Sequence, residues 1–189
     1  FTDSAVFTVT READHLMARM TGQRDFPIYP QSPIEFFSEP ADARITFVTG
    51  NGETATSLTL HQRGVDYPMP RIDAATAQQI ASRTEEKVKS QSASPGTEAA
   101  VRRLIDGLIS GEPNYDEMSP LLAQATRQQL PNLHSGMTEL RAVQSVTFLG
   151  VGAQGEDVYS VRHENGASHW RIALDADGKI STAWVTPGP

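Results

Sequence analysis

Cysteine is absent from this chain of 189 residues. Its absence excludes disulfide bonds, thiolate zinc sites, iron–sulfur clusters and cysteine nucleophiles. Long hydrophobic runs are absent too, and without a stretch of about 18 apolar residues the sequence predicts no membrane-spanning helix. Lysine is scarce: the only lysines are Lys87, Lys89 and Lys179, and none has a serine three residues before it. The Ser-x-x-Lys motif of serine hydrolases, the G-x-S-x-G elbow and the P-loop are therefore all missing.

Basic residues are outnumbered by acidic ones. The chain has 16 Lys and Arg against 23 Asp and Glu, which gives a net charge of −7. Such a charge makes binding to nucleic-acid phosphates improbable, and we expect no nucleic-acid partner. The content of 38% hydrophobic and 21% charged residues is typical of a folded globular protein. The length allows one large domain or two small ones.

The first 72 residues read as short strands. The expected strands are rich in β-branched and aromatic residues, and they span Val6–Thr10, His15–Met20, Phe26–Tyr29, Ile34–Ser38, Arg44–Thr49 and Thr56–Gln62. The segment 50–52, Gly-Asn-Gly, predicts a hairpin turn because glycine and asparagine accept positive φ. Six strands at this spacing predict a small all-β antiparallel barrel or sandwich over residues 1–72.

The composition changes after Ile72. Residues 74–89 contain helix formers and a narrow apolar stripe, so we expect a helical connector there. The polar segment 90–96 ends it and reads as a flexible linker. Residues 73–96 thus separate the β unit from a second unit at 97–189.

The second unit combines helices with strands. A helix begins at Thr97 as its N-cap and ends at Gly111, and another begins at Ser119-Pro120. Pro131 ends or restarts that helix before Leu140. The expected strands are Val143–Leu149, Asp157–Glu164, Ser168–Leu174 and Ile180–Val185. Helices followed by an antiparallel sheet predict an α+β fold.

A finer register follows from the turn at Asn165-Gly166. It pairs Val161 with Trp170 and Tyr159 with Ile172 on an apolar face. His163 falls on the same face, beside Ser168. The turn at 175–178 then places Trp184 on the core side with Trp170, although a slip of one residue would expose Trp184.

Three short motifs are weak. Residues 150–155 match G-x-G-x-x-G, but a dinucleotide site requires a helix after the loop and a strand is expected here. His163 and His169 are six residues apart across a turn, which does not suit a zinc site. Residues 175–178 resemble part of a calcium loop, yet the glutamate at position twelve is missing. We expect no metal and no cofactor.

Four side chains form the candidate site: Tyr159, His163, Trp170 and Trp184. They would line the concave face of a curved sheet. A titratable histidine among aromatic rings suits a small-ligand site or an acid–base site. The alternative is that these side chains form part of the hydrophobic core, with the histidine at the solvent-exposed end of the face. Apolar stripes of this kind more often belong to the core than to a binding site.

Several segments of the first 72 residues match a known family pattern in order and spacing. They are Phe7–Glu12, Thr21–Gln23, Phe26–Ser32, Phe36–Phe37, Ala43–Val48 and Leu58–Gly64. Together they resemble the lipocalin-like accessory domain found C-terminal to beta-lactamase-class serine hydrolases, the penicillin-binding-protein and D-aminopeptidase group. Members of that family have one more strand before the first one seen here. The resemblance therefore implies a barrel open at one edge or a shortened chain.

The second unit resembles a tail domain that can follow the first in such proteins. The matching segments are Pro95–Arg103, Tyr115–Pro120 and Asp157–Tyr159. Their order of helices and sheet is similar to the NTF2-like cone. Family members tend to be apolar where His163 stands, so this position departs from the pattern.

The resemblance implies a non-catalytic accessory region of a periplasmic or secreted serine hydrolase. The catalytic serine and lysine of those enzymes would lie upstream, outside this chain, so no catalytic residue is carried over. The expected partner is that catalytic domain in the same polypeptide, and an open strand edge would allow chains to pair. Two alternatives remain: a free-standing small-ligand-binding protein, and an NTF2-like enzyme that uses His163 as acid and base.

Overall fold

The computed structural model describes residues 4–50, 54–62 and 64–188. The chain divides into two compact units between Thr84 and Glu85. This boundary lies inside helix α1, Ala74–Ser90, within the region where the sequence predicts a connector. Each unit is described by itself.

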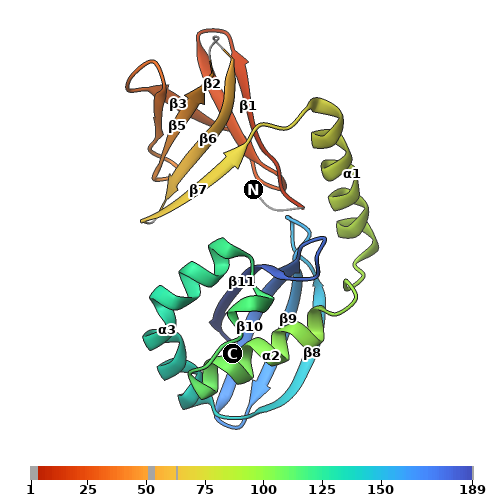
Figure 1. Ribbon diagram of the computed structural model, residues 1–189. Coiled ribbons are helices and arrows are strands. Elements are labelled where there is room, and N and C mark those ends of the chain that lie inside the picture. Colours follow the sequence, from red (N-terminus) through yellow and green to blue (C-terminus); the bar gives the residue numbers. More distant parts are fainter. Residues whose placement is uncertain (1–3, 51–53, 63, 189) are drawn as a thin grey trace. The chain divides into compact units, whose positions relative to one another are not determined.

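The first unit is a curled antiparallel sheet that forms a half-barrel (Figure 1). Its seven strands pair in chain order: β1 Phe7–Glu12, β2 His15–Met20, β3 Phe26–Pro30, β4 Glu35–Ser38, β5 Ala43–Thr49, β6 Ala55–Gln62 and β7 Val65–Pro70. All six predicted strands form, each end within two residues of its expected place. The predicted turn at 50–52 lies mostly outside the described residues.

Strand β7 was not predicted, because Pro68 and Pro70 argue against a strand. Both prolines are tolerated because β7 lies at the edge of the sheet. The N–H of Arg71 donates to the carbonyl of Thr56. The backbone N–H and C=O groups of the odd-numbered residues of β7 therefore point toward β6. The nitrogens of Pro68 and Pro70 therefore point away from β6, where no ladder hydrogen bond is lost.

Alternation along the strands separates two faces of this sheet. The inner face carries the apolar core, with Ala18, Ile28 and Ile45 fully buried and the rings of Phe36 and Phe47 in edge-to-face contact at 5.4 Å. The outer face carries mostly polar residues. This pattern is the one expected of a sheet with one face buried and the other solvated.

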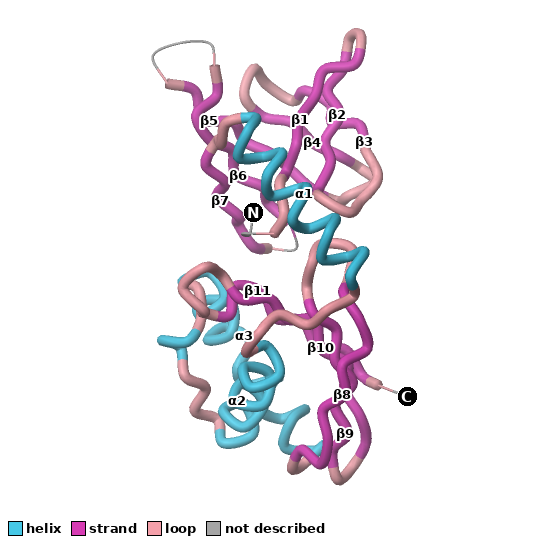
Figure 2. Tube along the Cα trace, turned by 90° about the vertical axis from the view of Figure 1, so that its right-hand side faces the viewer, coloured by secondary structure: helices cyan, strands magenta, loops and turns pink. Residues whose placement is uncertain are grey.

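The second unit is an α+β fold. Its elements are α2 Thr97–Ser110, the short 3₁₀ helix η1 Tyr115–Glu117, α3 Pro120–Leu140, β8 Val143–Val151, β9 Asp157–His163, β10 Gly166–Leu174 and β11 Ile180–Pro187. The antiparallel sheet has the order β11-β10-β9-β8. Helices α2 and α3 lie on one face of it (Figure 2).

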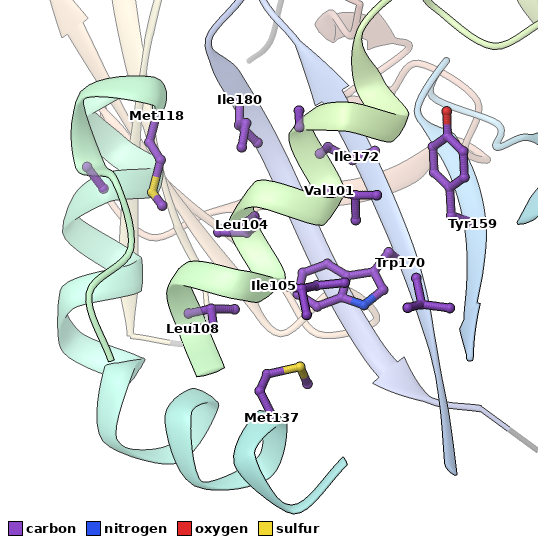
Figure 3. Close-up of a cluster of buried hydrophobic side chains, with 13 residues drawn as sticks. Val101, Leu104, Ile105, Leu108, Met118, Met137, Tyr159, Trp170, Ile172 and Ile180 are labelled. Atoms are coloured by element: carbon purple, nitrogen blue, oxygen red, sulfur yellow. The ribbon is translucent and has the colours of Figure 1, made fainter. Parts of the chain in front are cut away.

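The core of this unit lies between that sheet face and the helices. Val101, Ile105 and Leu108 of α2 are at most 1% exposed and belong to one cluster with Trp170 and Ile172 (Figure 3). Their spacing of four and three residues places them on one face of α2, and burying that apolar face is what holds α2 to the sheet.

The helix ends agree only in part with expectation. Ser119 caps α3 by accepting a hydrogen bond from the N–H of Leu122, and Gly111 ends α2 with φ of 76°. The N-cap of α2 is Gly96 rather than Thr97, whose hydroxyl bonds elsewhere. Helix α3 continues through Pro131 without a break.

The register of the β9–β10 hairpin differs from expectation by two residues. Trp170 pairs with Tyr159, and His163 pairs with Gly166. The two-residue loop is therefore Glu164-Asn165 instead of Asn165-Gly166. Because side chains alternate with a period of two, this shift leaves every residue on its expected face.

Candidate functional site

Three of the four predicted site residues meet inside the α+β unit. Tyr159, His163 and Trp170 lie on the inner face of β9 and β10, and each is 2% exposed. The rings of Tyr159 and Trp170 belong to the packed core beneath α2 (Figure 3). Trp184 does not join them: it is 53% exposed and pairs with Arg171, so its predicted inward orientation is wrong.

A β-bulge explains the outward orientation of Trp184. Leu174 pairs with Ile180, but Ala173 pairs with Thr182, so β11 contains one extra residue at Ser181. Without that residue the ladder would pair Trp170 with Trp184. With it, Trp170 faces Val185 and the tryptophan turns to the other face.

The imidazole of His163 is fully engaged by its own protein. Nε2 lies 2.8 Å from Oγ of Ser168, and Nδ1 lies 3.2 Å from the carbonyl oxygen of Arg141. Nε1 of Trp170 donates to the same Ser168 oxygen at 2.9 Å. One set of protons satisfies all three: Trp170 donates to Ser168, Ser168 donates to Nε2, and Nδ1–H donates to the carbonyl. Neither ring nitrogen is left to exchange a proton with a substrate.

A second buried polar cluster surrounds Asp157, which is 0% exposed. Its Oδ2 accepts from the N–H of Ser94 at 2.7 Å and from the hydroxyl of Thr97 at 2.6 Å. Oδ1 has no well-aligned hydrogen bond within the described chain, but Nζ of Lys87 lies 2.8 Å away and balances its charge. The segment expected to be a flexible linker is thus attached to β9.

Tyr159 extends the Asp157 cluster. Its hydroxyl lies 2.8 Å from Oγ1 of Thr97. Burial raises the pKa of the Tyr159 phenol, an effect that the hydrogen bond to Thr97 partly opposes and the charge of Asp157 adds to. Nζ of Lys87 also donates to the carbonyl of Gly155 at 2.6 Å. This lysine therefore serves as a structural cation.

The outer face of the seven-stranded sheet carries a different arrangement. Nδ1 of His61 lies 2.6 Å from Oδ1 of Asp66, and Nε2 lies 3.0 Å from Oγ1 of Thr46. Asp66 stands on β7, His61 on the neighbouring strand β6 and Thr46 on the next strand, β5. The side chain of His61 is 28% exposed and that of Asp66 is 72% exposed, so solvent reaches this group.

Two cross-strand rows organise this outer face. One row runs Tyr29, Phe37, Arg44, His61, Asp66 from β3 to β7. The adjacent row places Glu35 opposite Thr46. A groove of about 160 Å³ opens over these rows and is lined by Gln31, Glu35, Arg44, Thr46 and His61, together with Phe36 and Ile45.

The charged groups in the groove differ in their pairing. His61 has Asp66 as its partner. Glu35 and Arg44 are exposed, and the side chain of neither makes an ion pair or hydrogen bond with another described residue. Within the described residues, the groove therefore presents one unpaired carboxylate, that of Glu35, and one unpaired guanidinium, that of Arg44.

Asp66, His61 and Thr46 have the order of a hydrolase triad, but the surroundings do not suit acyl transfer. Such a reaction needs hydrogen-bond donors aimed at the developing oxyanion. Thr46 lies in an interior strand, paired with Glu35 on one side and Thr59 on the other. The backbone N–H groups around it are committed to the ladder, and the carboxylate opposite would repel an oxyanion.

The sequence patterns did not single out His61, and this group was not predicted. One signal was available. Gln62 pairs with Val65, and Gly64 has a φ of 75°, so a tight hairpin places His61 opposite Asp66. The prolines of β7 concealed that hairpin.

The weak motifs prove to be loops. Residues 150–155 form the end of β8 and its connection to strand β9, and Oδ1 of Asp175 accepts from the N–H groups of Asp177 and Lys179 within a turn. In the part of the chain that is described, no group of three or more His, Asp or Glu side chains is placed to hold a metal ion.

No helix in the described part of the chain is both long enough and apolar enough to cross a bilayer. A scan against family models found no matching family, and searches of curated proteins and of solved structures found no match.

Proposed function

We propose that this chain is a non-catalytic accessory region of an exported serine hydrolase. In this proposal the curled sheet is the lipocalin-like domain, the α+β unit is the NTF2-like tail domain, and the whole is periplasmic or secreted. The catalytic domain would lie in the same polypeptide, and the accessory region would shape substrate access or assembly.

One observation supports this proposal above the others: the interior of the α+β unit is occupied by its own side chains. Both ring nitrogens of His163 have protein partners, and Trp170 is 2% exposed. An NTF2-like enzyme that used His163 would need substrate or water at one of those nitrogens. A packed core instead favours a unit that acts as a rigid body.

The test is the size of the native polypeptide. An antibody against this chain would be used on an immunoblot of the source cells, and the detected band would be excised and its peptides sequenced by mass spectrometry. We expect a band clearly larger than 20.6 kDa, with an upstream Ser-x-x-Lys peptide. A band at 20.6 kDa would overturn the proposal, and so would a longer polypeptide without that motif.

A free-standing small-ligand-binding protein is the second candidate. The groove of about 160 Å³ on the outer face of the sheet favours it, because free charged groups line that groove. Native mass spectrometry of the chain isolated from its source would separate the two candidates. A 20.6 kDa polypeptide that carries a bound small molecule would support the second one.

A further inference from the structure

We propose that the groove on the outer face of the seven-stranded sheet binds a small zwitterion, a molecule with a carboxylate and an ammonium group a few ångströms apart. The proposal is independent of whether the chain belongs to a longer hydrolase. Its basis is the pair of free, opposite charges, Glu35 and Arg44, that line the same groove.

The positions of these charges separate two ends of a ligand. Glu35 is opposite Thr46, whereas Arg44 lies two residues away along β5, in the next cross-strand row. Rows on one face of a strand are about 6.6–6.8 Å apart. Glu35 and Arg44 form no ion pair with each other. A ligand with both charges bridges the rows, whereas a single ion contacts one end only.

Arg44 is suited to the carboxylate end. A guanidinium offers a planar pair of N–H donors that matches a carboxylate, and it stays charged at every physiological pH. Its neighbours in the row are Phe37 and His61. The ring of Phe37 lies 5.8 Å from that of Tyr29, so an aromatic pair borders this end and can cover an apolar part of the ligand.

Glu35 and Thr46 are suited to the ammonium end. When Asp66 accepts the Nδ1–H of His61, the tautomer with its single proton on Nδ1 lets Nε2 accept the proton of Thr46. In that tautomer the proton of Thr46 is committed to His61, and the Thr46 oxygen offers lone pairs only. A carboxylate and an acceptor oxygen directly opposite each other form a site for N–H donors. His61 and Asp66 are positioning residues in this arrangement.

The size of the groove limits the ligand. A volume of about 160 Å³ is below the range of roughly 300–1,000 Å³ found for drug-sized ligands. A free amino acid, or the zwitterionic end of a compound that extends into solvent, fits this limit.

The test is a titration of the ¹⁵N-labelled full chain followed by NMR. Three probes of similar shape separate the charges: alanine has both, alanine amide only the ammonium, and N-acetylalanine only the carboxylate. We expect alanine to cause saturable shifts at the amides of β4, β5 and β6, and each single-charge analogue to bind about tenfold more weakly or worse. Saturable binding of N-acetylalanine as tight as that of alanine, or no saturable shift with alanine at about 10 mM, would overturn the proposal.

Charge-neutral variants assign the two ends. Arg44→Gln and Glu35→Gln should each weaken alanine binding by about tenfold or more. The matched controls Arg24→Gln and Glu39→Gln change exposed residues of the same unit outside the groove and should leave binding unchanged. Undiminished chemical-shift dispersion in each variant shows that the sheet is still folded. Equal affinities for all four variants would contradict the assignment.

The isosteric change Thr46→Val tests the acceptor role of the hydroxyl. It should weaken alanine binding by about fivefold and leave binding of N-acetylalanine unchanged, because that probe has no ammonium group. If the affinities of both probes fall by the same factor, Thr46 acts only through the shape of the groove, and the assignment of the ammonium end is wrong.

Discussion

In the α+β unit, Asp157, His163 and Ser168 are at most 2% exposed, and their polar atoms are directed at other parts of the same unit. In the seven-stranded sheet, His61 and Asp66 form a similar short contact, but their side chains are 28% and 72% exposed. The same chemical groups thus have two roles. Buried, they fix a core in one arrangement, since unsatisfied polar atoms there are costly. Exposed beside unpaired charges, they remain available to a ligand.

The two tryptophans give the sharpest test of this comparison. Trp170→Ala should lower the free energy of unfolding by about 3–5 kcal/mol, because it leaves a large cavity in the core and removes a donor to Ser168. Trp184→Ala should cost less than about 1 kcal/mol, since that side chain is 53% exposed. Urea denaturation followed by far-UV circular dichroism measures both. Similar costs would mean that Trp184 is also a core residue.

The two lysines of α1 provide a second test, with a smaller expected loss of stability. Lys87→Met leaves the carboxylate of Asp157 buried without a cation and should cost about 2–3 kcal/mol, less than for a fully enclosed pair because Lys87 is 24% exposed. Lys89→Met removes only an exposed pair with Glu85 and should have little effect. The same denaturation measurement applies. If Lys87→Met is as mild as Lys89→Met, water reaches Asp157 and the cluster is not truly buried.

Tyr159 should make the α+β unit sensitive to alkaline pH. Burial raises the pKa of its phenol in the folded state. The contribution of Tyr159 to stability is therefore fully present below the pKa of its phenol in the unfolded chain, about 10. This contribution falls as the pH rises from there through the folded-state pKa. Stability measured from about pH 8 to 11 should decline less in Tyr159→Phe than in the natural chain. Tyr29→Phe, at an exposed position, should keep the full decline; an identical loss in both variants would exclude Tyr159 as its source.

The smallest effect is expected at His61. His61→Asn should change the free energy of unfolding by less than about 1 kcal/mol, because its contacts are partly solvated. His163→Asn should cost about 1–3 kcal/mol, since it disturbs a closed hydrogen-bond network. Denaturation midpoints of the two variants give the comparison directly. Should the His61 variant prove the less stable, its contact with Asp66 is a structural element of the sheet.

Sequence patterns predicted most of the fold because the strands alternate strongly between apolar and polar residues. The six predicted strands of the sheet and the four of the α+β unit all form. The strand β7 escaped prediction because Pro68 and Pro70 are acceptable only at an edge, and edges are defined by tertiary pairing. Helix α3 likewise continues past Pro131, where the local rule expects a break.

The candidate site was harder to predict, because it depends on register. Tyr159, His163 and Trp170 were placed on the correct face even with a hairpin shifted by two residues. Trp184 was misplaced because a single extra residue at Ser181 reverses the faces, and no residue type marks such a bulge. Thr46 and Asp66 are 20 positions apart in the chain, and only the pairing of three strands brings both to His61.

The prolines of β7 give the curled sheet one obstructed edge and one regular edge. At β7, Pro68 and Pro70 remove two of the outward N–H donors, whereas β1 contains no proline. Extension of the sheet by another strand is therefore favoured on the β1 side alone. Joining two copies there, β1 against β1 about a two-fold axis, would use up both available edges. The curled sheet would then have no edge free of proline left, so extension of this sheet would stop at two chains.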